Sequence, residues 1–170
     1  DLADRVIAVS SISKSHAAPG FRSGWCVGPA AFCTALLPVS ETMLFGNQPF
    51  IADMTEKAVR DGSSVAAGMA ARVAARADVL ARRLHGETPL TVHQPDAGMF
   101  ALVNVSGIGM DGDTYAWDLL EHGVSVMPGS AFGESLKDWV RVALTIDDSQ
   151  FATALDRIVA HANLSKRNVA

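Results

Sequence analysis

The segment Ser11–Trp25 constrains the fold of this chain more than any other part of the sequence. It follows the apolar run Val6–Val9, which has the pattern of a short buried strand, and it leads into a second apolar run, Trp25–Gly28. Between the two runs lie Lys14 and the turn residues Pro19-Gly20. We therefore expect two neighbouring strands of one sheet, joined by a loop that carries a lysine.

Lys14 has the sequence surroundings of a nucleophilic lysine. It follows a predicted buried strand, and Ser11 and Ser13 place hydroxyl groups beside it. A lysine amine attacks carbonyl carbons only in its neutral form, which partial burial or a nearby cation favours. Arg22 follows the Pro-Gly turn, and its planar guanidinium suits a phosphate. Each cation alone is more often a solvent-exposed surface residue, so their joint spacing is what indicates a site.

A third cation, Arg141, stands inside the apolar run Trp139–Leu144. An unpaired charge in such a run is costly to bury, so we expect an anion to meet it. One candidate is a carboxylate of the chain itself, with Asp96 and Asp138 available. The other candidate is an anionic substrate.

Several motifs occur in a fixed order along the chain. Ser-Ile-Ser-Lys and Pro-Gly-x-Arg-x-Gly come first, followed by Pro-Asp-Ala-Gly-Met-Phe, Pro-Gly-Ser-x-Phe-Gly and Val-Arg-Val. This succession resembles the class I and II aminotransferases, which are fold-type I enzymes that depend on pyridoxal 5′-phosphate (PLP). The resemblance implies an α/β fold, with the C-terminal part of the PLP-binding large domain in residues 1–62. Residues 63–88 would be the connecting helix, and residues 89–170 the small α+β C-terminal domain.

The resemblance also implies a role for each candidate residue. Lys14 would hold PLP as a Schiff base and act as the catalytic base, while Ser11, Ser13 and Arg22 would bind the cofactor. Arg141 would bind the α-carboxylate of the substrate. Ser-Lys-Ser-His-Ala around the lysine and the later Met-Leu-Phe-Gly are similar to the arginine:pyruvate aminotransferase branch. We therefore expect a donor L-amino acid such as arginine and an acceptor such as pyruvate or 2-oxoglutarate.

The sequence also departs from the family pattern. Family members place an aspartate for the pyridine nitrogen and a tyrosine for the cofactor oxygen upstream of the lysine, but only 13 residues precede Lys14. We expect this chain alone to be inactive and the enzyme to be a longer parent protein. Two alternatives remain open, namely a PLP-dependent carbon-sulfur β-lyase on the same fold and a non-catalytic truncated interaction module.

Composition argues against several other classes of protein. Hydrophobic residues make up 49% of the chain and charged residues 19%, a composition typical of packed globular proteins. The net charge is -4, and the sequence has no stripe of basic residues that could bind nucleic acid. No apolar run reaches the roughly 20 residues of a membrane span. The two cysteines lack zinc-site spacing, and the five histidines are scattered, so we expect no metal. These absences predict a cytoplasmic protein that binds neither nucleic acid nor membrane, and the resemblance implies a homodimer.

Helix signals recur between these motifs. A helix that buries one side should run over 30–37 and end at Pro38, and another over 51–60 should stop at Asp61-Gly62. A long amphipathic helix should extend from Ser63 or Ser64 to Gly86, with its arginines facing solvent. Later patterns predict a central strand over 98–105, a helix capped by Asp113 or Thr114, a strand over 124–127 and a final helix capped by Asp147 or Asp148.

Overall fold

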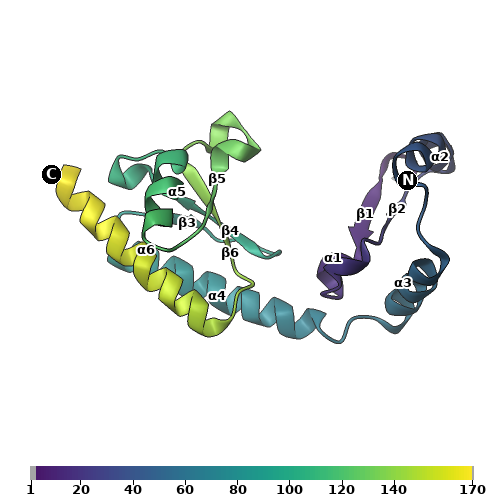
Figure 1. Cartoon of the computed structure of the whole chain (residues 1–170), viewed down its shortest axis with the longest axis horizontal. Coiled ribbons are helices and arrows are strands. Elements are labelled where there is room, and N and C mark those ends of the chain that lie inside the picture. Colours follow the sequence, from purple (N-terminus) through teal and green to yellow (C-terminus); the bar gives the residue numbers. More distant parts are fainter. Residues whose placement is uncertain (1–2, 170) are drawn as a thin grey trace. The chain divides into compact units, whose positions relative to one another are not determined.

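The computed structural model describes residues 3–169 and contains two compact units, Asp1–Met69 and Ala70–Ala170 (Figure 1). In the described residues, no helix combines the length and the hydropathy needed to span a membrane.

The first unit is built on a two-stranded antiparallel hairpin. Its main elements are β1 (Ala8–Ser11), α1 (Ile12–Ser15), β2 (Gly24–Val27), α2 (Ala30–Leu44) and α3 (Pro49–Asp61). Ser11 pairs with Gly24 across the hairpin, so the segment between them forms a closed loop. A Cβ atom on Gly24 would come within 2.7 Å of the Ser10 carbonyl oxygen, so this close pairing requires glycine.

The prediction of a buried strand over Val6–Val9 is wrong in place and in environment. The strand begins at Ala8, two residues later than predicted, and Val9 is 77% exposed. An apolar strand becomes buried only when another layer covers its face. Among the described residues of the first unit, Ile12 and Ser23 alone are buried, so the helices of this unit do not bury the strands of the hairpin.

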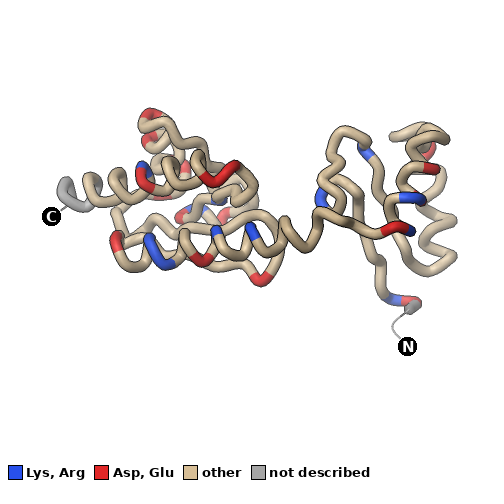
Figure 2. Tube along the Cα trace, turned by 90° about the horizontal axis from the view of Figure 1, so that it is seen from below, with Lys and Arg blue, Asp and Glu red and all other residues tan. Residues whose placement is uncertain are grey.

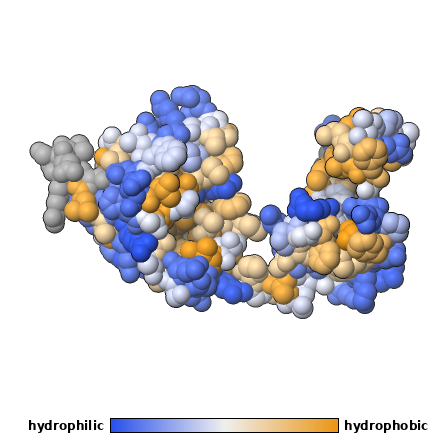
Figure 3. Space-filling view, viewed as in Figure 1, coloured by the Kyte–Doolittle hydropathy of each residue, from blue (hydrophilic) through white to orange (hydrophobic). Residues whose placement is uncertain are grey.

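Helix α2 extends past the residue that was expected to end it. It continues through Pro38 to Leu44, because a proline removes one backbone donor but does not prevent the following residues from forming helical bonds. The Thr42 hydroxyl donates to the Pro38 carbonyl at 2.8 Å. The expectation of a buried side is also wrong, since no α2 residue is buried, and hydrophobic residues gather on the surface over α2 in Figure 3.

The second unit contains a four-stranded antiparallel sheet with the order β3-β4-β6-β5. Its strands are β3 (Thr91–His93), β4 (Phe100–Asn104), β5 (Met127–Pro128) and β6 (Trp139–Ala143). Its helices are α4 (Ala66–Glu87), which begins in the first unit, α5 (Gly112–Glu121) and α6 (Asp148–Val169). The predicted central strand is confirmed, because β4 lies between two other strands. The strand predicted over 124–127 is reduced to the two residues of β5.

One face of this sheet forms the core of the second unit. Ala101 and Val103 of β4 pair with Val142 and Val140 of β6, and all four residues are buried. Val142 lines a small cavity with residues of α4 and α6, so this face points toward the helices. Side chains alternate along a strand, so Arg141 lies on the opposite face of the sheet.

Arginines join α4 to α6. Arg76 is 6% exposed, and its Nε and Nη2 atoms donate to Asp148 Oδ1 at 3.0 and 2.6 Å. Its Nη1 atom donates to the Leu144 carbonyl at 2.7 Å. Arg83 bonds Asp156 of α6, and Figure 2 shows basic and acidic residues along these helices. The prediction that the arginines of this helix form a solvated face is therefore wrong for Arg76.

Candidate active site

Lys14 lies in α1, the single helical turn that follows β1. The first residue of α1 is bonded to the residue just before β2, because the Ile12 amide donates to the Ser23 carbonyl at 3.3 Å. The Lys14 side chain is exposed, whereas the sequence predicted a shielded position. Within the described residues, its amine has no hydrogen bond and no ion pair.

His16 connects the lysine turn to α3. Its Nε2 atom lies 2.9 Å from the Ala58 carbonyl oxygen, and its Nδ1 atom lies 2.8 Å from the Ser15 hydroxyl. A carbonyl oxygen only accepts, so Nε2 carries the proton in this contact. These two contacts give His16 a packing role between the lysine turn and α3.

Arg22 has a left-handed backbone conformation, with a φ of 51°, just before β2. Its Nη1 atom donates to the Pro19 carbonyl at 2.9 Å, and its other donors have no partner in the part of the chain that is described. The next residue, Ser23, is buried and accepts hydrogen bonds from Asn47 at 3.0 Å and Thr55 at 2.7 Å. These two hydrogen bonds fix Ser23 and so hold the adjacent backbone of Arg22 in place.

Sequence reasoning missed Ser23 and Thr55 as supports of this loop. Asn47 donates to the Ser23 hydroxyl of its own chain. The one feature of the sequence that could have indicated this support was a small polar residue directly after the candidate arginine. Its two partners come from residues 24 and 32 positions away, which local patterns do not reveal.

Ser11 and Ser13 lie on the same loop as Lys14 and Arg22. Both serines are half-buried, and neither hydroxyl has a hydrogen-bond partner among residues 4–164. The loop therefore offers hydroxyl, ammonium and guanidinium donors that no described acceptor of the chain occupies. Such a donor set fits a ligand that carries a phosphate and a carbonyl group. Their assignment as cofactor ligands remains a prediction.

Arg141 of β6 lies against two aromatic rings. Its guanidinium carbon is 4.2 Å from the ring centroid of Phe100 and 4.9 Å from that of Phe132. No carboxylate of the described chain lies within ion-pair distance of Arg141, and Asp96 and Asp138 do not pair with it. Stacking on aromatic faces holds a guanidinium plane and leaves its N–H edge available for an anion.

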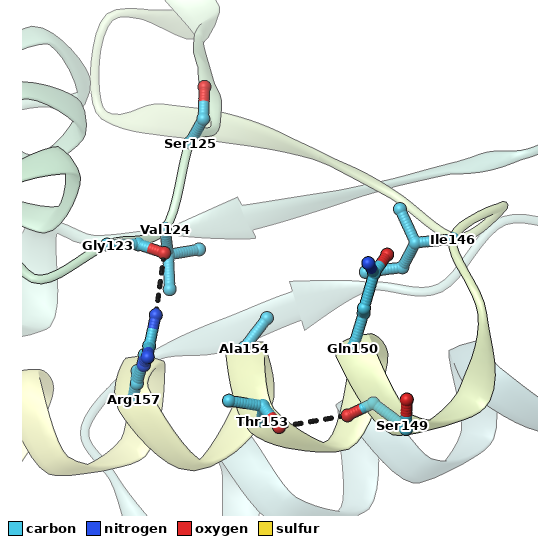
Figure 4. Close-up of a pocket in the computed structure, with 9 residues that line it drawn as sticks. All are labelled: Gly123, Val124, Ser125, Ile146, Ser149, Gln150, Thr153, Ala154 and Arg157. Atoms are coloured by element: carbon cyan, nitrogen blue, oxygen red, sulfur yellow. Dashed lines mark hydrogen bonds between the residues drawn. The ribbon is translucent and has the colours of Figure 1, made fainter.

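A cavity of about 370 Å³ in the second unit lies between α6 and the segment Gly123–Ser125 (Figure 4). Arg157 Nη1 donates to the Gly123 carbonyl at 2.9 Å on its wall, and Thr153 donates to the Ser149 carbonyl at 2.9 Å. Its lining contains no lysine, histidine or carboxylate. The cavity therefore has no amine, imidazole or carboxylate that could act as a nucleophile or as a base.

Comparisons with known proteins show which family the chain belongs to. A profile of the family described as aminotransferase class I and II matches residues 1–158. The arginine–pyruvate transaminase of Pseudomonas aeruginosa is 36% identical over 158 residues, which are 92% of this chain and 40% of that protein. The chain thus spans well under half the length of this relative.

Solved structures show the same fold. The aromatic aminotransferase of Pyrococcus horikoshii superposes with a TM-score of 0.87 at 21% identity, over 99% of this chain and 45% of that one. A PLP-bound putative aminotransferase of Clostridium difficile gives a TM-score of 0.80 at 22% identity, over 92% of this chain and 41% of that one. The fold is that of the fold-type I aminotransferases, and the chain belongs to the class I and II aminotransferase family.

Proposed function

We propose that this chain is the C-terminal portion of a PLP-dependent aminotransferase in which Lys14 is the catalytic residue. The observation that carries the proposal is the loop Ser11–Gly24, which holds a lysine amine, two serine hydroxyls and several guanidinium N–H groups that no described acceptor of the chain occupies. The family supports the cofactor, and a protein of the same fold is known in a PLP-bound form. Because the chain spans about 40% of its relative, activity is assigned to the longer parent protein.

Each residue of the loop has a defined task in this proposal. PLP, when bound, accepts the electron pair that remains when a bond at the substrate Cα breaks. Lys14 Nζ, in its neutral form, accepts the proton from that Cα. Arg22 donates to the phosphate with a planar pair of N–H groups, and the Ser11 and Ser13 hydroxyls donate to the remaining oxygens.

Arg141 binds the substrate α-carboxylate. Phe100 and Phe132 hold the guanidinium plane, so the carboxylate is met in one orientation and the Cα–H bond is directed consistently. Positioning of this kind is worth several kcal/mol of a reaction barrier, about 7–11 kcal/mol at its largest.

The proposed donor is a basic L-amino acid such as arginine, and the acceptor is pyruvate or 2-oxoglutarate. Support comes from the likeness to the arginine–pyruvate transaminase of P. aeruginosa. We further propose that residues 1–62 complete a large domain supplied mainly by upstream sequence, that 63–88 connect the domains, and that 89–170 form the small domain of a homodimer.

Covalent trapping tests the proposal. This chain and a version extended upstream are mixed with PLP, reduced with borohydride, digested and mapped by mass spectrometry. In the extended protein the label should fall on Lys14 and disappear in Lys14→Ala. The matched control is Lys57→Ala, which removes an exposed lysine of the same unit and should leave the label in place.

Three outcomes separate the alternatives. A label on Lys57 and Lys137 as strong as that on Lys14 would show nonspecific modification. No label in either protein would favour the non-catalytic interaction module. A specific label at Lys14 together with pyruvate, ammonia and thiol released from a thioether amino acid, without amino transfer to 2-oxo acids, would favour the β-lyase.

A further inference from the structure

Three residues that the proposed reaction does not use lie together where α5 ends beside α6. They are Asp118, His122 and His161, and each offers one ligand atom within 4.8 Å of the others. Asp118 and His122 are four residues apart at the end of α5, and His161 comes from α6. The sequence suggested scattered histidines, because His161 is 43 positions from its aspartate.

Hydrogen bonds already orient these side chains as metal ligands are oriented. His122 Nδ1 lies 2.9 Å from the Asp118 backbone oxygen, and a carbonyl oxygen only accepts, so Nδ1 carries a proton. The neutral ring then has its lone pair on Nε2. A backbone carbonyl that fixes the tautomer of a histidine is the usual support of a metal-ligating imidazole.

The second histidine contacts the carboxylate of the same aspartate. His161 Nε2 lies 2.9 Å from Asp118 Oδ2, and its ring meets the His122 ring edge-to-face at a centroid distance of 4.8 Å. Tyr115 packs on the His161 ring at 5.2 Å. His161 is therefore held in place on two sides by aromatic rings.

Burial is graded across the cluster. The His161 side chain is 3% exposed, the Asp118 side chain is 43% exposed, and His122 is exposed. A cation can thus enter from solvent and keep water as a further ligand, while one ligand is fixed in the core. The cluster also lies at the carboxyl end of α5, where the helix dipole favours positive charge.

We propose that Asp118, His122 and His161 bind one divalent transition-metal cation of the Zn²⁺ type. Two imidazoles and one carboxylate suit Zn²⁺, Co²⁺ or Ni²⁺, whereas Mg²⁺ and Ca²⁺ prefer oxygen ligands. The metal takes the place of the hydrogen that His161 Nε2 shares with Asp118. In a neutral ring that proton moves to Nδ1, and in a doubly protonated ring it leaves to solvent. Because the ligands come from α5 and α6, the bound cation fastens the two helices together.

The geometry requires a small rearrangement of one side chain. Metal–ligand distances near 2.1 Å place tetrahedral ligands about 3.4 Å apart, which is closer than the widest separation in the cluster. His122 is exposed and can rotate by this amount, whereas His161 is held by its neighbours.

Titration of the untagged chain with Zn²⁺, followed by calorimetry and histidine side-chain NMR, tests the site. We expect one ion per chain, with shifts confined to the His122 and His161 rings, and a rise in the unfolding midpoint as Zn²⁺ is added. His122→Gln and Asp118→Asn should each weaken binding by at least about tenfold. His122→Gln changes an exposed side chain, and Asp118→Asn keeps the shape of a side chain that is 43% exposed, so both avoid the folding defect that His161→Ala could cause.

His85→Gln and His93→Gln serve as matched controls, since both histidines are exposed and lie outside the cluster. They should bind Zn²⁺ as the unaltered chain does. Equal binding by His122→Gln and the unaltered chain, loss of binding in a control variant, or no Zn²⁺ uptake would each overturn the proposal. Its failure would leave the PLP proposal untouched, because none of the three ligands takes part in it.

Discussion

Two arginines of this chain lie in partly apolar surroundings and have different kinds of partner. Arg76 is buried and bonds to Asp148 and to the Leu144 carbonyl. Arg141 is half-buried between two phenyl rings and has no described carboxylate partner. A buried cation with its own acceptors stabilises the fold, whereas a fixed cation without them is prepared for a ligand.

Replacement of Arg76 tests the first of these roles. Arg76→Ala removes three hydrogen bonds and leaves the buried Leu144 carbonyl without its partner, so we expect a loss of about 2–3 kcal/mol in the free energy of unfolding. Arg72→Ala, on an exposed position of the same helix, should change stability by less than about 0.5 kcal/mol. Urea unfolding followed by circular dichroism measures both, and equal effects would contradict a structural role for Arg76.

Replacement of Arg141 tests the second role. In the extended protein, Arg141→Ala should lower kcat/KM for the amino acid by about 100-fold, because a charge-assisted contact to the α-carboxylate is lost. The corresponding amine, which lacks that carboxylate, should be affected only slightly. Arg141→Lys should lie between the two, since it keeps the charge but loses the planar fork. Equal losses for acid and amine would show that Arg141 does not bind the carboxylate.

At the level of helices and strands, local sequence signals located elements better than they described their surroundings. The strand β4 and the helix α3 were predicted from apolar runs and from the Gly62 stop, because these signals act within a few residues. The burial of Arg76 was not predicted, because its partner Asp148 is 72 residues away. The hydrogen bonds that Ser23 accepts from Asn47 and Thr55 were not predicted either, because these partners are also distant in the sequence.

Helix starts in the second unit depend on aspartate caps. The Asp111 carboxylate accepts from the Thr114 amide at 2.7 Å and starts α5, so the cap lies two residues before Asp113 and three before Thr114, the two predicted caps. Asp147 accepts from the Gln150 amide at 2.9 Å and starts α6, as predicted. Hydrogen bonds from Thr114 lower the pKa of Asp111, and bonds from Ser149 and Gln150 lower that of Asp147.

These lowered pKa values predict a pH dependence of stability. A carboxyl whose pKa is lower in the folded chain stabilises the fold above its unfolded pKa, and this contribution disappears as pH falls through the folded pKa. Asparagine also caps helices but carries no charge. The stability advantage of the unaltered chain over Asp111→Asn/Asp147→Asn should therefore shrink below the ordinary aspartate pKa of 3.8. Urea midpoints measured from pH 7 to pH 2 would show it, and a constant difference would contradict it.

On the scale of the whole molecule, the two units differ in how much core they possess. The described part of the first unit buries Ile12 and Ser23, whereas the second unit buries a continuous set of side chains from its sheet and helices. Regions with few buried apolar contacts open at low free-energy cost. We expect limited proteolysis to cut within residues 4–65 well before it cuts within 70–164, as mass spectrometry of the fragments would show. Earlier cleavage inside α6 or the four-stranded sheet would contradict this order.

The apolar surface of the first unit predicts self-association. Met43 is 72% exposed and Phe45 is 94% exposed, and the burial of one such side chain is worth about 1.5–3 kcal/mol. Sedimentation velocity over a range of concentrations should show a dimer or larger oligomer of the chain. Met43→Ser/Phe45→Ser should weaken association by at least about tenfold, since each 1.4 kcal/mol is a factor of ten. Trp117→Ser removes an equally exposed apolar residue of the second unit and should have no effect, so a loss of association in that variant would place the interface elsewhere.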